Sequence, residues 1–203
     1  SYNKGIINQA AGETGTMNIT GDFINHDTAS ITQENVNIAS PGSLTTNAET
    51  VTVTNTDKNI QNAGRINLTG GDNSQNIVAY NSAKGTVKIS GDVTNTSGTT
   101  IDQAGLTVDS GKTFVNEGTV SATELANNGT VTNNSDLSVT NGDNNGTING
   151  NGTMNIAGVV DNTDANASIQ QDTVNITTGT GWLATLANKV VASIFNAGTL
   201  ELT

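Results

Sequence analysis

Internal repetition is the feature that most constrains the fold of this chain. Three segments align with one another: residues 15–38, 85–108 and 152–176. The first two align without a gap, and the third needs one extra residue between Asn162 and Ile169. Similar segments that recur along a chain indicate a stack of structural units, each of which is completed by its neighbours.

A shorter unit recurs within and between these large repeats. It consists of an Asn, one spacer residue or none, a Gly, and then an alternating segment. Copies of the unit occur at residues 62–68, 116–120, 128–131, 145–148 and 196–202. Asn and Gly tolerate the backbone conformations of tight turns, so each copy predicts a turn followed by a strand. Asn residues at equivalent turns could also stack into hydrogen-bonded ladders.

Apolar residues in the predicted strands alternate with polar ones. A period of two predicts a strand that buries one face and exposes the other. The alternating pairs are Met17/Ile19, Val36/Ile38, Val51/Val53, Ile66/Leu68, Val87/Ile89, Leu106/Val108, Leu137/Val139, Met154/Ile156, Val174/Ile176 and Leu200/Leu202.

Composition discriminates between two all-β architectures. Asn and Thr supply about a third of the 203 residues, far above ordinary usage, while aromatic residues supply 3%. A β-sandwich usually fills a core about 10 Å thick with large side chains, whereas a solenoid needs only stacked ladders of Val, Ile and Leu. We therefore expect one parallel β-helix over residues 1–203, with turns of roughly 20 residues and large repeats beginning near residues 15, 85 and 152. Tandem β-sandwiches are the alternative.

One segment departs from the alternating pattern. Residues 181–195 carry two apolar stripes with a spacing of four, one of which begins at Trp182 and the other at Leu183. This spacing predicts a short amphipathic helix over 182–195. Because the ends of a solenoid expose strand edges and core, we expect this helix to cover the flank or the end of the β-helix.

The charge and the absence of cysteine exclude several classes of partner and site. The net charge is −11 and the chain has no Cys. Nucleic acid is excluded as a partner because it requires a basic surface, and an anionic membrane surface is disfavoured for the same reason. No run of about 18 apolar residues is present to span a membrane, so we expect no membrane insertion. Disulfides and zinc thiolates are ruled out as well.

Catalytic groups are sparse, and we expect neither an enzyme nor a cofactor. His26 is the single histidine, and its counterparts in the other large repeats are Thr96 and Thr163, so we interpret it as a solvated turn residue. Asp22 and Asp92 occupy equivalent repeat positions, but Gly158 and Val159 stand at that place in the third repeat. A pair of carboxylates for polysaccharide cleavage is therefore not maintained.

Two sets of residues are candidates for binding. Asp161, Asp164 and Asn166 place oxygen ligands in a pattern that loosely matches a calcium loop, although the Gly and the distal Glu of an EF-hand are missing. We expect no metal site beyond this partial match. Trp182 and Tyr80 are the candidates for a partner contact, because aromatic residues dominate binding hot spots.

The Asn-x-Gly-Thr strand units, the aliphatic alternation and the missing Cys resemble the passenger regions of bacterial secreted adhesins, namely filamentous-haemagglutinin-like exoproteins and autotransporters. The resemblance covers essentially the whole chain. It implies a right-handed parallel β-helix, export across the outer membrane, display at the bacterial surface or release from it, and a role in virulence. The implied partners are a host-cell receptor, extracellular matrix, glycan or another bacterial surface.

Two roles in cell adhesion are compatible with this resemblance. The chain is either a binding module or a stalk that spaces a distant tip from the cell. The alternatives outside adhesion are a polysaccharide-degrading β-helix enzyme and a purely structural protein of a surface layer or matrix. The sequence leaves the oligomeric state open.

Overall fold

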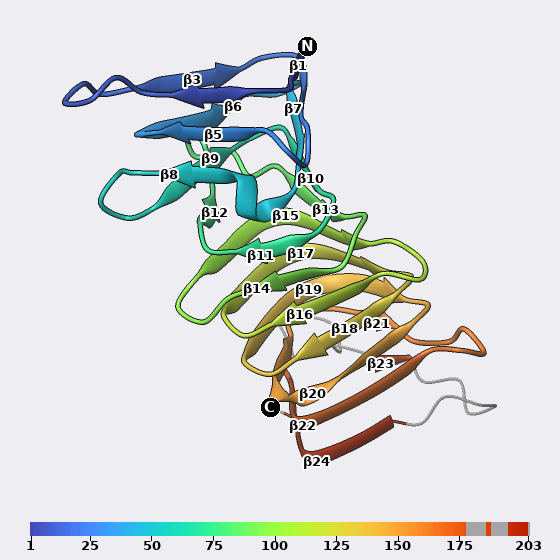
Figure 1. Ribbon diagram of the computed structural model, residues 1–203. Helices are drawn as coiled ribbons and strands as arrows, with labels where there is room; N and C mark the ends of the chain where they lie inside the picture. Colours follow the sequence, from blue (N-terminus) through green and yellow to red (C-terminus); the bar gives the residue numbers. More distant parts are fainter. Residues whose placement is uncertain (178–185, 188–194, 203) are drawn as a thin grey trace.

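The computed structural model describes residues 1–177, 186–187 and 195–202, which form a stack of parallel β-strands. The chain enters at one end of the stack and advances turn by turn to the other end (Figure 1). Each turn carries strands on up to three faces, which we call A, B and C. The fold is thus a parallel β-helix, as the sequence predicts.

Faces A and B are continuous along the stack. The strands confined to face A are β3 (Thr16–Ile19), β6 (Asn35–Ile38), β9 (Asn59–Asn62) and β12 (Asn76–Val78). Those confined to face B are β1 (Tyr2–Asn3), β4 (Asp22–Asn25), β7 (Ser43–Thr46), β10 (Arg65–Leu68), β13 (Thr86–Ile89), β21 (Val160–Asp161) and β23 (Leu186–Ala187). Three long strands bend from face A onto face B, namely β15 (Thr100–Val108), β17 (Thr119–Asn127) and β19 (Asp136–Asn144).

Face C consists of two parts, and the first part ends after three strands. Its first part is a separate three-stranded sheet of β2 (Ile6–Asn8), β5 (Ser30–Gln33) and β8 (Val51–Val53). Its second part begins beside the 3-10 helix η1 (Ala48–Thr50), where the Ala48 amide donates to the Gly70 carbonyl at 2.8 Å. It contains β11 (Gly71–Asn73), β14 (Val93–Asn95), β16 (Thr113–Asn116) and β18 (Thr130–Asn133), then β20 (Thr147–Ile156), β22 (Ser168–Ile176) and β24 (Phe195–Leu202), which bend onto face A.

The number of turns follows from the strand register on face A. One position of the strand register recurs once per turn, at Met17, Val36, Ile60, Ile77, Ile101, Val120, Leu137, Met154, Val174 and Leu200. These positions span nine turns, close to the ten expected from a turn of roughly 20 residues. Between Val120 and Met154 the turns are regular, since each takes 17 residues.

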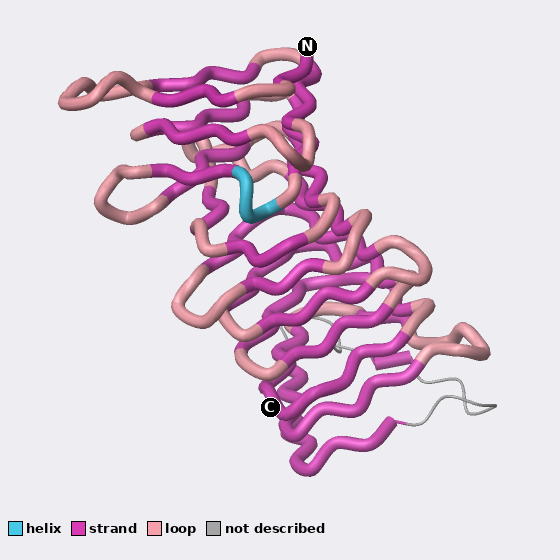
Figure 2. Tube along the Cα trace, viewed as in Figure 1, coloured by secondary structure: helices cyan, strands magenta, loops and turns pink. Residues whose placement is uncertain are grey.

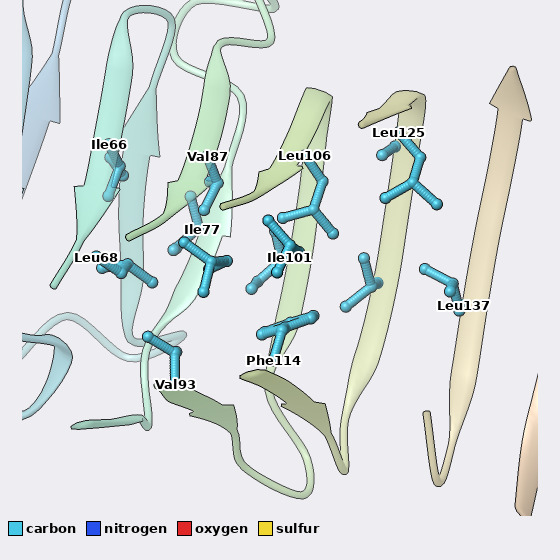
Figure 3. Close-up of a cluster of buried hydrophobic side chains, with 14 of the residues drawn as sticks. Ile66, Leu68, Ile77, Val87, Val93, Ile101, Leu106, Phe114, Leu125 and Leu137 are labelled. Atoms are coloured by element: carbon cyan, nitrogen blue, oxygen red, sulfur yellow. The ribbon is translucent and has the colours of Figure 1, made fainter. Parts of the chain in front are cut away.

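The core is a set of aliphatic columns along the axis. On face B, Ile66, Val87, Leu106 and Leu125 follow one another in register and are almost fully buried. Figure 3 shows this row beside buried side chains of the other faces, among them Val93 and Phe114 on face C. The paired strands of the named elements are all parallel, which is incompatible with antiparallel β-sandwiches.

The expected helix at 182–195 is wrong wherever the structure describes that segment. Leu186 and Ala187 form β23 and pair with β21, and Phe195 begins β24, which pairs with β22. The remainder, with Trp182, lies outside the described residues. Over the described part of the chain, helix is confined to η1 (Figure 2). The spacing of four fails as a signal here because open edges of β21 and β22 offer backbone hydrogen bonds, which override a local helical preference.

The large repeats do not all lie on the same faces. Met17 and Met154 belong to one column on face A, but their repeat counterpart Val87 lies on face B, in register with Ile66 and Leu106. The second repeat is therefore rotated by one face relative to the first and third. A similar sequence is accommodated on either face because both faces present the same alternation of inward and outward residues.

Candidate functional site

A hollow lies on the outside of face B. Its volume is about 710 Å³, and its lining includes Gly105, Glu124, Ala126, Asp143 and Asp161. Gly105 and Ala126 occupy neighbouring outward columns and have the smallest side chains there, so the surface sinks between longer neighbours. The hollow therefore arises from side-chain size on a flat sheet.

A second hollow of about 310 Å³ continues along the same face toward the N-terminus. The two share Thr86 and Thr107, so together they make one trough across β7 to β21. The N-terminal part contains Arg65 and Lys88, whereas the C-terminal part is lined by carboxylates and by no Lys or Arg of the described chain. The trough is therefore charged with opposite sign at its two ends.

Neighbouring acids partly compensate the cationic end. Lys88 Nζ lies 2.9 Å from Asp109 Oδ2, and an Arg65 nitrogen lies 3.7 Å from Asp22 Oδ1. Both pairs are substantially exposed, so each contributes little to stability. Asp143 and Asp161 stand directly opposite each other on β19 and β21. The acidic end of the trough thus holds two carboxylates in register.

Ladders of buried asparagine side chains line the inner corners of the helix. The longest begins at the junction of faces C and A, where each amide nitrogen donates to the next amide oxygen. The bonds run Asn73 to Asn95 (2.9 Å), Asn95 to Asn116 (3.0 Å), Asn116 to Asn133 (2.8 Å) and Asn133 to Gln171 (2.8 Å). A second ladder on face B links Asn127, Asn144 and Asn162 at 2.7 and 2.6 Å. These bonds confirm the expected Asn ladders.

The ladders explain the Asn-x-Gly unit. The inward Asn accepts a hydrogen bond from the amide two residues later, as in Asn116 Oδ1 with Gly118 N at 3.2 Å and Asn127 Oδ1 with Gly129 N at 3.1 Å. The Gly is required because a Cβ there would collide with a carbonyl of the preceding turn, that of Thr99 in the case of Gly118. Sequence reasoning aligned the unit on Asn128, which faces outward, and so missed the inward Asn127.

Tyr80 is presented by a small hairpin between β12 and β13. Tyr80 and Ala83 exchange two backbone hydrogen bonds of 3.0 Å, and Asn81 and Ser82 both have positive φ. Two successive residues with positive φ define a type I′ turn. The tyrosine is half-buried, and it does not line either part of the trough. Trp182, the other aromatic candidate, falls outside the described residues.

Two of the three calcium candidates, Asp161 and Asp164, serve as turn caps. Asp161 Oδ1 accepts from the Thr163 amide at 3.0 Å, and Asp164 Oδ1 accepts from the Asn166 amide at 2.9 Å. Both are Asx turns, in which a carboxylate replaces a backbone acceptor. Within residues 1–177 and the two described strands beyond them, no three His, Cys, Asp or Glu side chains cluster closely enough to hold a metal ion.

His26 is exposed in the turn between β4 and β5. Its backbone amide donates to the Asn3 carbonyl at 3.0 Å, and its carbonyl accepts from Ala29 at 2.8 Å. The structure therefore places it where the repeat pattern predicts, in a solvated turn. None of the residues lining the trough is a histidine.

Comparison of this chain with protein-family models, with curated proteins and with solved structures gave no match. Among the helical residues that the structure describes, none forms a helix long and apolar enough to cross a membrane. The geometry of the chain itself is therefore the basis for a functional assignment.

Proposed function

We propose that this chain is a stalk segment of a bacterial adhesin, either displayed at the cell surface or secreted. The observation that carries the proposal is the register of face A, which continues over nine turns. At about 4.8 Å per turn, the stack spans about 43 Å. Because every turn is hydrogen-bonded to the next one, such a stack holds a distant binding tip at a defined distance from the cell.

The outward surface supports a stalk more than a binding module. The large hydrophobic residues exposed in the described chain are few: Tyr2, Ile6, Ile24 and Val159. Tyr2 and Ile6 belong to the first turn and Ile24 to the second, where it pairs with Tyr2, and the faces from there to Val159 carry mainly Asn, Thr and Asp. Binding hot spots are rich in Trp, Tyr and Arg, and of these types only Arg65 stands on the described strands between Ile24 and Val159. Host receptors, matrix, glycans or other bacteria would then be contacted by other parts of the adhesin.

Surface labelling of intact cells tests the adhesin assignment. Antibodies raised against the folded chain should bind the unbroken bacteria that produce it, or its culture medium, and a chain confined to the cell interior would contradict the proposal. The stalk role is tested separately with the isolated chain on matrix proteins, glycans and host cells. No saturable binding is expected, and binding that is lost in Tyr80→Ala would instead assign a binding module.

The acidic end of the trough favours a second candidate, polysaccharide cleavage. Asp143 and Asp161 are register partners on neighbouring strands, and most glycosidases act with a pair of carboxyl groups that flank the scissile bond. The assay is release of reducing ends from acidic and neutral polysaccharides. Activity that disappears in Asp143→Asn, with an unchanged circular dichroism spectrum, would establish the enzyme. Inactivity of the wild type on both classes of polysaccharide would exclude cleavage of those substrates.

A further inference from the structure

Five Asn-Gly pairs lie close together in the sequence, at residues 128–129, 141–142, 145–146, 149–150 and 151–152. This dipeptide is chemically reactive because glycine leaves the following amide nitrogen unhindered, so that it can reach the asparagine side chain. The five pairs share the same intrinsic chemistry. Differences in their reactivity in the folded protein must therefore come from the structure around each pair.

Four of the five pairs are held by hydrogen bonds or by strand pairing. The Gly129 amide donates to Asn127 Oδ1 at 3.1 Å, and Asn128 itself accepts from Asn145 Nδ2 at 3.0 Å. The hydrogen bond between Asn145 and Asn128 also restrains the Asn145 side chain of the 145–146 pair. Reaction at either residue requires the local turn to open.

The other two restrained pairs lie in strands. Asn141 donates from Nδ2 to Glu124 at 3.1 Å and accepts from the Val159 amide at 3.1 Å, while the Gly142 amide donates to the Val159 carbonyl at 2.9 Å. Asn149 is paired on both sides, with Thr132 and with Gln170. Both positions are therefore fixed within the sheet.

Asn151 is in a different situation. The register of β20 with β22 is interrupted between Gly150 and Thr153, so Asn151 and Gly152 have no strand partner on that side. On the preceding turn, strand pairing stops at Asn149 and resumes at Thr153, so neither residue has a strand partner on that side either, although Gly152 itself is buried against the Ser135 backbone. Asn151 is exposed, and within the described residues its side-chain amide makes no hydrogen bond. A β-bulge of this kind bends the strand and leaves the extra residue unpaired.

We infer that Asn151 is a site of spontaneous deamidation in the folded protein, to which the other four Asn-Gly pairs are resistant. The Gly152 nitrogen, after losing its proton to solvent base, attacks Cγ of Asn151. The Cγ–Nδ2 bond breaks and ammonia leaves, which closes a five-membered succinimide. Water then opens the ring at either carbonyl and yields Asp or isoaspartate. No oxidant or cofactor is needed.

The product adds one negative charge at the corner between faces C and A. Asn151 contacts this corner through its own amide, which donates to Asn134 Oδ1 at 3.4 Å, while Asn134 Nδ2 donates to Glu117 at 2.8 Å. On the following turn, Asp172 lies opposite the bulge. The new carboxylate would therefore join a row that already has an acid on either side, and the chain would become more acidic as it ages.

Peptide mapping of the aged protein tests the inference. The native chain is incubated in mildly alkaline buffer, and deamidation at each Asn is quantified by fragmentation mass spectrometry, with isoaspartyl methyltransferase labelling as the second readout. A parallel incubation in concentrated urea measures the five intrinsic rates. In the folded protein, Asn151 should react at nearly its unfolded rate, while the other four should slow by at least about ten-fold because they wait for local opening.

Two variants sharpen the result. Asn151→Gln keeps an exposed amide of similar polarity but disfavours ring closure, so the acidic form that appears on ion exchange should be lost without a change in fold. Asn127→Ala frees the Gly129 amide and should accelerate reaction at Asn128. Native-state deamidation of Asn128 or Asn145 as fast as that of Asn151, or an undiminished acidic form in Asn151→Gln, would overturn the inference.

Discussion

Removal of the Asn116 side chain should destabilise the β-helix far more than its size suggests. Asn116 is fully buried and makes four hydrogen bonds. It accepts from Asn95 Nδ2 (3.0 Å) and the Gly118 amide (3.2 Å), and it donates to Asn133 Oδ1 (2.8 Å) and the Asp136 carbonyl (3.0 Å). Asn116→Ala therefore leaves unpaired groups on the turns above and below as well as on its own turn.

The magnitude follows from counting those groups. Asn95 Nδ2, the Gly118 amide and Asn133 Oδ1 each lose the one side-chain bond described above. A buried polar group that loses its partner costs about 1–3 kcal/mol. The three together predict a decrease of about 3–9 kcal/mol in the free energy of unfolding, the lower value applying if water enters the space.

Urea unfolding followed by circular dichroism measures this decrease as a shift in midpoint at constant slope. The matched control is Asn128→Ala, one residue beyond Asn127 of the second ladder. Asn128 is exposed and its side chain makes one hydrogen bond, with Asn145, so the loss of this side chain should change stability by less than about 0.5 kcal/mol. If Asn116→Ala shifts the midpoint no more than Asn128→Ala does, the inner ladder does not support the fold and the reasoning fails.

Three further predictions concern glycine, the core and the surface charges. Gly118→Ala should lower the free energy of unfolding by about 3 kcal/mol because the new Cβ meets the Thr99 carbonyl. The control Gly21→Ala has nothing within 4 Å of the added Cβ, so it should leave stability unchanged or raise it by up to about 1 kcal/mol. Equal urea midpoints for the two variants would contradict the close stacking of turns. Leu106→Ala should lower the free energy of unfolding by about 2–5 kcal/mol because Leu106 faces the core, and Thr107→Ala should lower it by under about 1 kcal/mol because Thr107 faces outward. Thermal unfolding of the two variants measures both losses, and similar losses would refute the assigned faces. Lys84→Met removes a partly exposed ion pair, in which Lys84 Nζ lies 2.6 Å from Asp102. The loss of stability, measured by urea unfolding, should stay below about 1 kcal/mol and vanish at high salt. A larger loss that does not depend on salt would contradict its description as a surface contact.

The outer trough could not have been predicted from the sequence. Gly105, Glu124 and Asn141 are outward neighbours in space, yet they lie 19 and 17 residues apart in the chain and share no motif. Each is an ordinary outward residue of its own strand. The hollow exists only because small residues of different turns fall side by side, which depends on the register between turns.

The sequence by itself determined the local structure of this protein. Alternation such as Val87-Lys88-Ile89 specifies which side chains face the core, because successive residues of a strand point to opposite sides. The Asn-x-Gly unit specifies the corners, because the Asn side chain caps the turn and only Gly fits beneath the preceding carbonyl. These are interactions within a few residues, so one segment contains all the information they need.

Only the tertiary structure decided how the turns stack. The length of each corner determines how many residues separate one paired strand from the next. The face on which a repeat lies therefore depends on the lengths of all the preceding corners. For this reason Val87 lies on face B although its sequence counterpart Met17 lies on face A. For the same reason the apolar stripes that predict a helix over 182–195 are overruled at Leu186 and Phe195, where the free edges of earlier strands supply the backbone partners.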